Sequence, residues 1–278
     1  LKSRETFILA NNWFMIFFLA TVLIGMLYPI FLDVLTNVKI SVGPPFFNIV
    51  IIPLVIPLLF LMAIGPKFGW VKSQNKIVKK ILFLILGATI INLFIFYFFG
   101  KYSLLSNLIF IAAIFLILHS ILEIIKFFNK KKKPELPRIV SHLGFGLLVF
   151  FIGINHQFSL EMDFNLKAGE IKKINNYEIN FEDIKIKDSK NYQAIIGKFK
   201  LTNLKNNSVE YLDPEIRIYS NPETLTYEAA IKTKITSDLY LTMSNVSRSD
   251  YYNIKFQNKP FMIWIWLSAL MIASGGFM

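Results

Sequence analysis

Long apolar runs separated by short basic segments dominate the first 154 residues of the chain. Several runs carry no charged residue and approach the roughly 20 residues that a helix needs to cross a lipid bilayer. The pattern predicts a membrane region, residues 1–154, with five transmembrane helices, and a sixth, truncated helix at the end of the chain. The predicted spans are 13–32, 46–64, 81–99, 104–125, 139–154 and 261–278.

Residues 155–260 follow a different pattern, in which apolar and polar residues alternate. The segments YEINFEDI (177–184) and EIRIYS (215–220) are examples, and Asn, Gly, Asp and Pro separate such segments. A period of two residues is typical of half-buried β-strands. The fold class that we predict is a polytopic α-helical membrane protein with an inserted β-rich extracytoplasmic domain, either a barrel or a sandwich.

Basic residues flank the predicted helices unevenly. Lys39 and Lys101 lie in the loops on one side of the bilayer. The flanking basic residues on the opposite side are Lys2, Arg4, Lys67, Lys72, Lys76, Lys79, Lys80, Lys126, Lys130, Lys131, Lys132, Lys133 and Arg138. Because Lys and Arg accumulate in cytoplasmic loops, the second side is predicted to be cytoplasmic and residues 155–260 to lie outside.

Composition agrees with a membrane protein, since 54% of the residues are hydrophobic and the mean hydropathy is +0.51. The net charge of +12 reflects topology, because residues 155–260 contain nearly equal numbers of basic and acidic residues; no nucleic-acid partner is expected. The chain has no cysteine, so a thiol step would need a partner. The sequence lacks a Gly-rich phosphate loop, HExxH and GxSxG, so no residue of this segment is predicted to be catalytic.

His142, in the segment SHLGFG, lies about one turn inside the cytoplasmic end of the fifth span. Ionisable residues within a span are costly and are often functional. Gly146 and Gly153 share its helix face and would leave room for a flat ligand such as haem, with the imidazole as axial ligand. The alternative is a helix-packing face on which His142 bonds to a neighbouring carbonyl.

His119 and Glu123 lie four residues apart on the predicted fourth span, so they share one face. One interpretation is a pair that neutralises a buried charge. In another, Glu123 orients a ligating His119, and His119 and His142 together hold one haem. His156 is predicted to be an ordinary residue at the outer surface.

The segment SVGPP places a glycine and two prolines before the second span. Pro44 and Pro45 suit the first turn of a helix, where backbone N–H groups lack partners, and Gly43 is expected to allow a sharp turn before them. Pro53 and Pro57 recur within the span and weaken its backbone hydrogen bonds, so a bend is expected there.

The ordered series of short motifs resembles the C-terminal half of the CcmF family, the haem-lyase membrane component of bacterial cytochrome c maturation. The likeness covers nearly the whole chain. The motifs are SRETFILANN (3–12), TVLIGMLYPIFLD (21–33), ISVGPPFFN (40–48), SHLGFGLL (141–148), LKAGE (166–170), YEINFEDI (177–184), PE-x-R-x-Y (214–219), YEAAI (227–231), SDLYL (237–241) and WIWLSAL (264–270).

This resemblance implies a protein of the bacterial inner membrane whose β-rich domain lies in the periplasm. It implies that transient haem is received there and attached to the Cys-x-x-Cys-His motif of apocytochrome c. His142 matches the second of two transmembrane histidines that ligate a resident haem b in the family; the other ligand and the family's haem platform would precede Leu1. The segment alone is therefore expected to be inactive.

The implied partners are apocytochrome c, a haem-delivery chaperone, other maturation subunits and the lipid bilayer, with quinol as a further candidate. Two other functions remain open at this point. One is a non-catalytic membrane scaffold or haem conduit of the same pathway. The other is a small-solute transporter with its site at the proline-interrupted second helix.

Overall fold

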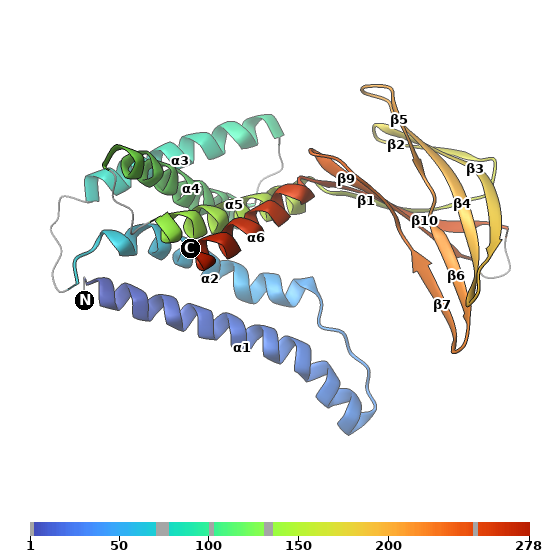
Figure 1. Ribbon diagram of the computed structural model, residues 1–278, viewed down its shortest axis with the longest axis horizontal. Coiled ribbons are helices and arrows are strands. Elements are labelled where there is room, and N and C mark those ends of the chain that lie inside the picture. The colour runs from blue at the N-terminus through green and yellow to red at the C-terminus, as the bar shows by residue number, and fades with distance from the viewer. Residues whose placement is uncertain (1–2, 71–77, 100–102, 131–135, 247–249) are drawn as a thin grey trace. The chain divides into compact units, whose positions relative to one another are not determined.

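The computed structural model divides into two compact units, residues 1–153 with 264–278 and residues 154–263. It describes the whole chain except residues 1–2, 71–77, 100–102, 131–135 and 247–249. Figure 1 shows helices in the first unit and strands in the second. The predicted fold class, apolar helices with an inserted β-rich domain, is confirmed, and the β-rich domain is a sandwich.

Among the described residues, five helices are long and apolar enough to cross a membrane. The helices run α1 (Arg4–Thr36), α2 (Pro44–Ile64), α3 (Val78–Phe99), α4 (Leu104–Lys130), α5 (Leu136–Phe158) and α6 (Met262–Phe277), with the 3-10 turn η1 (Gly65–Lys67) after α2. α6 has 16 residues, fewer than a span ordinarily needs. Most helices extend beyond the predicted spans, because the chain stays helical through polar residues at the ends.

The helix before the β-rich domain runs a few residues past Asn155, the predicted start of that domain. α5 continues to Phe158, and the first strand begins at Leu160. The last helical turn is held by the Ser159 N–H, which donates to the Asn155 carbonyl over 2.9 Å. The end of α5 is therefore set by hydrogen bonds to its last carbonyls. The change from apolar to polar residues near Asn155 does not mark it.

α4 is the central helix of the helical unit. Ala112, Ala113 and Phe115 of α4 are fully buried, and they pack with Leu59 and Ala63 of α2 and with Ala88 of α3. Small side chains at these contacts let helix backbones approach closely, as is common between helices in lipid. Between α3 and α4, Asn92 donates a hydrogen bond to Asn107 over 2.9 Å.

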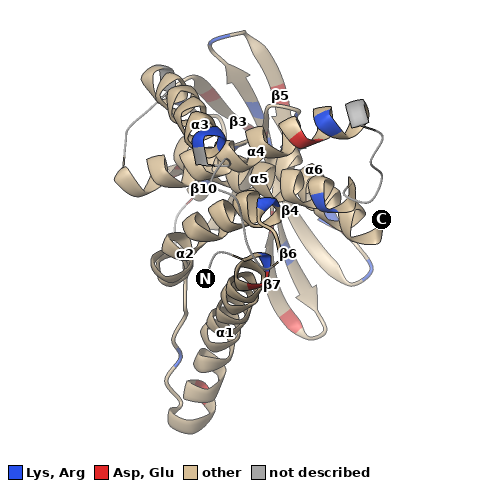
Figure 2. Cartoon of the chain, turned by 90° about the vertical axis from the view of Figure 1, so that its left-hand side faces the viewer, with Lys and Arg blue, Asp and Glu red and all other residues tan. Residues whose placement is uncertain are grey.

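The outer surface of the helical unit is largely apolar. α1 exposes Trp13, Ile16 and Leu19 along its length, and Figure 2 shows charged residues mainly near helix ends. An apolar surface of this extent is unfavourable in water and suits contact with lipid tails.

The segment between α1 and α2 begins with a left-handed residue, Asn37. α1 ends at Asn37, whose φ of 55° is left-handed, and the Asn37 N–H donates to the Asp33 carbonyl over 2.9 Å. Gly43 precedes α2 with φ −102°, a conformation open to any residue. Pro44 does begin α2, and the helix is continuous through Pro53 and Pro57.

Two antiparallel sheets form the sandwich. The first has the strand order β1 (Leu160–Leu166), β10 (Tyr252–Pro260), β9 (Ser237–Asn245) and β8 (Ala230–Thr233). The second has the order β2 (Ile171–Ile174), β3 (Tyr177–Asp188), β4 (Tyr192–Asn203), β6 (Glu215–Ser220) and β7 (Glu223–Glu228), with β5 (Ser208–Leu212) also paired to β4. Pairing of β1 with β10 brings the two ends of this unit together.

Alternate residues of both sheets form one core. Ile179 and Phe181 of β3 and Phe199 of β4 meet Leu241 of β9 and Phe256 of β10, and all are essentially inaccessible to solvent. The Phe181 and Phe199 rings stack with centroids 4.2 Å apart. The apolar residues of the alternating pattern are therefore those that face the core of the sandwich.

Gly197 of β4 marks the tightest point of this core. A Cβ there would lie 2.6 Å from Cε2 of Phe199 and 2.8 Å from Sδ of Met243. Gly197→Val should destabilise the sandwich by about 1–3 kcal/mol through overpacking.

The measurement is hydrogen exchange of the β4 and β9 amides in the detergent-solubilised protein, where protection should fall. Gln193→Ala, an exposed position on the same strand, is the matched control. Equal protection in the two variants would contradict the assigned packing.

Candidate functional site

His142 lies on the wall of a pocket of about 460 Å³ in the helical unit. Pockets of this size, mainly apolar with a few polar groups, are typical of small-molecule and cofactor sites. The lining residues come from α1, α2, η1, α5 and α6: Arg4, Phe7, Ile8, Asn11, Met15, Leu61, Met62, Gly65, Pro66, Arg138, His142, Phe145 and Ile272.

The imidazole of His142 has an unused polar atom. Its Nδ1 is buried and makes no hydrogen bond within the described part of the chain. Buried polar atoms nearly always have partners, so such an atom requires an explanation. The alternative predicted from the sequence, a hydrogen bond to a neighbouring carbonyl, is not made by this atom.

Contacts at the start of α1 hold Arg4 at the pocket. The Arg4 N–H donates to the Gly69 carbonyl over 3.0 Å, and the Arg4 guanidinium lies 5.0 Å from the centre of the Trp70 ring, a cation–π contact. One turn on, Phe7 stacks on Phe68 with centroids 4.7 Å apart. The beginning of α1 is thereby fixed against the segment that follows α2.

Gly146 does not open onto the pocket. A Cβ at Gly146 would lie 3.0 Å from Cγ1 of Ile117, so this glycine lets α4 approach α5 closely. Gly153 has the same role, because its Cβ would meet the ring of Phe110 at 2.9 Å. The space that the sequence suggested for a macrocycle beside Gly146 contains α4, and the space beside His142 is built by α1, α2 and α6.

Glu123 of α4 is bound by two cations from other elements. Lys67 of η1 lies 2.9 Å from Oε1, and Arg138 of α5 donates to Oε2 over 2.9 Å. The Glu123 side chain is 10% exposed, so this is a largely buried ion triad. Such a group needs every member, since removing one leaves an uncompensated charge.

His119 does not pair with Glu123 by a hydrogen bond. Its Nδ1 is 3.9 Å from Oε2 of Glu123, beyond hydrogen-bonding range. In the structure Lys67 and Arg138, and not His119, neutralise the charge of Glu123. His119 lines a second pocket, and His142 is not among the residues of that pocket. This arrangement does not favour one haem held by both histidines.

The other residues singled out in the sequence lie apart from the His142 pocket. Gly43, Pro44 and Pro45 form the start of α2 and are absent from its lining. His156 is exposed in the last turn of α5. Part of the basic set lies outside the described residues: Lys2, Lys72, Lys76, Lys101, Lys131, Lys132 and Lys133.

Arg4 and Arg138 are site residues that sequence reasoning treated only as topological charges. A signal for one of them was present, because Arg138 precedes His142 by four residues and so shares its helix face. No comparable signal exists for Arg4, which reaches the pocket from another helix. Its place depends on how α1 packs, and spacing along the chain does not contain that information.

Comparisons with known proteins give one consistent family. Residues 157–260 match the family model of the CcmF C-terminal β-sandwich. A cytochrome c-type biogenesis protein CcmF from Pseudomonas fluorescens is 28% identical over 291 residues, covering 100% of this chain and 44% of the relative. The CcmF of Escherichia coli strain K12 is also 28% identical, over 284 residues with the same coverage.

The chain resembles the C-terminal part of CcmF. A solved structure described as the cytochrome c haem lyase CcmF has the same fold, with a TM-score of 0.76 at 18% identity over 98% of this chain and 45% of that one. The resemblance predicted from the motifs is therefore confirmed. The chain spans less than half the length of the CcmF proteins that it matches.

The ion triad gives a test of how the helices around the site are held. Glu123→Gln would leave Lys67 and Arg138 without their shared carboxylate, and we expect a loss of about 3 kcal/mol in stability because the charges are partly desolvated. The readout is the midpoint of thermal unfolding in detergent, which should fall by several degrees.

Glu5→Gln is the matched control, since Glu5 is exposed in the first turn of α1. A midpoint for Glu123→Gln as high as that of Glu5→Gln would show that the triad does not stabilise the helical unit.

Proposed function

We propose that this chain is the C-terminal part of a CcmF-type haem lyase component, with His142 as one axial ligand of a resident haem b. In this function the whole protein helps to attach haem covalently to apocytochrome c on the periplasmic side. The pocket around His142 is the observation on which the proposal rests. The second axial ligand would come from outside this segment.

The residues of the pocket fit a haem. Phe7, Met62 and Phe145 supply apolar walls, as a macrocycle requires. Arg4 and Arg138 line the same pocket and could bind the two propionate carboxylates, for which guanidinium groups are well suited. The unpartnered Nδ1 of His142 is a further sign that this imidazole interacts with something other than the protein.

A haem bound in this pocket would supply one-electron redox chemistry. The chain's own residues would bind and orient it. His142 is held on α5, whose position against α4 depends on the close approach at Gly146 and Gly153. Glu123 holds Arg138 through a 2.9 Å hydrogen bond, so the guanidinium has a fixed position at the edge of the pocket.

The proposed location is the bacterial inner membrane, with the β-sandwich in the periplasm. The charge asymmetry of the loops supports this orientation. The partners that go with the function are apocytochrome c, a haem-delivery chaperone and other maturation subunits, with quinol as a further candidate. The alternative function is a non-catalytic scaffold or haem conduit, in which His142 would be structural.

The first test is the visible spectrum of the purified intact protein that carries this chain. His142→Ala should remove the low-spin haem signal of the reduced-minus-oxidised spectrum, and His142→Gly should recover part of it when imidazole is added. Both effects follow from loss of an axial ligand from a pocket that is otherwise intact.

His156→Ala, at the exposed end of α5, should keep the full signal at equal protein level. An unaltered spectrum in the His142 variants would instead make the histidine structural and favour the scaffold function.

The β-sandwich has a surface suited to an extended client chain. β7 is an edge strand of its sheet, and Ile218 of β6 pairs with Leu225 of β7, while Tyr227 lies two residues further along β7. These three side chains face the same side of the sheet and remain exposed. Edge strands bind extended peptides by adding a strand, with side-chain pockets or patches giving further affinity.

We therefore expect β7 to contribute to binding of unfolded apocytochrome c. Leu225→Lys combined with Tyr227→Lys should weaken binding of a peptide with the Cys-x-x-Cys-His motif by about ten-fold, because two apolar contacts are lost. Tyr211→Lys on β5, also exposed, is the control. The measurement is fluorescence anisotropy of the labelled peptide. Unchanged affinity in the double variant would indicate that the sandwich has a structural role.

A further inference from the structure

We propose that the pocket beside His119 binds the phosphate group of an anionic phospholipid. This pocket has a volume of about 450 Å³ and is distinct from the one around His142. Elements η1, α2, α3 and α4 build it. Its lining combines four lysines with a buried histidine and several large apolar side chains.

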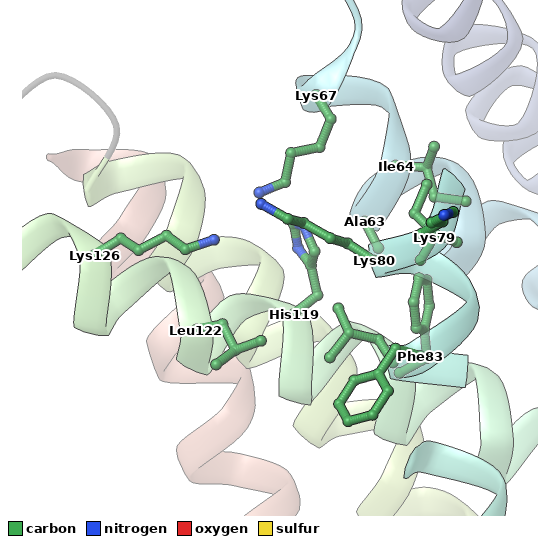
Figure 3. Close-up of a pocket in the computed structure, with 12 residues that line it drawn as sticks. Ala63, Ile64, Lys67, Lys79, Lys80, Phe83, His119, Leu122 and Lys126 are labelled. Atoms are coloured by element: carbon green, nitrogen blue, oxygen red, sulfur yellow. The ribbon is translucent and has the colours of Figure 1, made fainter. Parts of the chain in front are cut away.

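Three of the four lysines point to the same side of the pocket. Figure 3 shows the amino groups of Lys67, Lys80 and Lys126 directed toward the space above the His119 ring, and the amino group of Lys79 directed away from it. The three come from η1, α3 and α4 respectively. Basic pockets between transmembrane helices are typical sites for the head groups of anionic lipids.

His119 supplies the buried polar group of the site. It is 5% exposed, and neither ring nitrogen makes a hydrogen bond within the described part of the chain. The carboxylate of Glu123 is 3.9 Å away and already binds Lys67 and Arg138. A phosphate oxygen could accept a hydrogen bond from the imidazole N–H and so satisfy a group that the protein leaves unpartnered.

Few acidic residues lie in the part of the helical unit that the structure describes. The acidic residues that the structure describes in the helical unit are Glu5, Asp33 and Glu123, and Glu123 is the one that contacts the lysine pocket through Lys67. Lys80 and Lys126 also line the pocket, and clusters of basic residues at a membrane surface attract anionic lipids.

The apolar part of the pocket explains why the ligand should carry an acyl chain. Phe83, Leu84, Phe115 and Leu122 line it beside the charged groups. A free phosphate would use the amino groups and leave this surface uncovered, whereas a phospholipid would cover both. A free phosphate and a phospholipid both offer phosphate oxygens to the lysines. The apolar lining favours the phospholipid, because its acyl chains would cover that surface.

The test is native mass spectrometry of the intact protein in neutral detergent, titrated with phosphatidylglycerol or with phosphatidylcholine of the same acyl chains. Phosphatidylglycerol should bind more tightly. Lys80→Gln with Lys126→Gln should weaken its binding by about 25-fold, since each lysine near a membrane surface contributes about five-fold. This double variant leaves the Lys67 contact with Glu123 in place.

Lys79→Gln is the matched control, because it removes the same charge from the neighbouring position of α3 and should change affinity by less than about two-fold. His119→Phe should weaken phosphatidylglycerol binding by about five-fold. Inorganic phosphate, added as competitor, should not displace the lipid at equal concentration.

Equal affinity for the two lipids, or equal effects of the double variant and Lys79→Gln, would overturn the proposal. Displacement of the lipid by equimolar phosphate would show that the pocket binds free phosphate and would contradict a phospholipid ligand. The inference does not depend on the haem proposal, because the haem spectrum of the same samples should be unaltered in every lysine variant.

Discussion

The arrangement of the helical unit depends on the ion pairs that two cations form with Glu123. A carboxylate within an apolar helix is costly, and here Lys67 and Arg138 reach it from η1 and α5, each at 2.9 Å. The contact therefore ties α4 to both neighbouring elements. It also fixes Arg138 beside the His142 pocket and leaves His119 without a carboxylate partner. Of the two cations that bind Glu123, Lys67 lines the His119 pocket and Arg138 lines the His142 pocket.

Much of the fold could be predicted, because its driving forces leave periodic patterns in the sequence. Apolar runs between basic loops indicated the long helices, and alternation in segments such as YEINFEDI indicated strands whose inward residues, Ile179 and Phe181, do form the core. Helix ends were less accurate. The last turn of α5 has a backbone hydrogen bond from Ser159 to Asn155, and α1 is followed by a left-handed Asn37, which the sequence analysis did not single out.

The site was predicted only in part, for a physical reason. A histidine within a span is conspicuous, so His142 was singled out as a haem ligand; it lines a pocket, and its role as a ligand stays a prediction. The roles of Gly146 and Glu123 depend on which helices are neighbours, and a face of one helix does not reveal what packs against it. Gly146 proved to contact α4, and Glu123 proved to bind Lys67 and Arg138. Such long-range pairings are set by tertiary packing.

The central claim is that the imidazole of His142 ligates a haem iron in the intact protein. Electron–nuclear double resonance of the oxidised protein, prepared with ¹⁵N-labelled histidine, reports iron-bound imidazole nitrogens directly. We predict coupling to labelled histidine nitrogen that is lost or altered in His142→Gln and preserved in His156→Gln. Identical coupling in wild type and His142→Gln would contradict the claim, because the ligand would then be another residue.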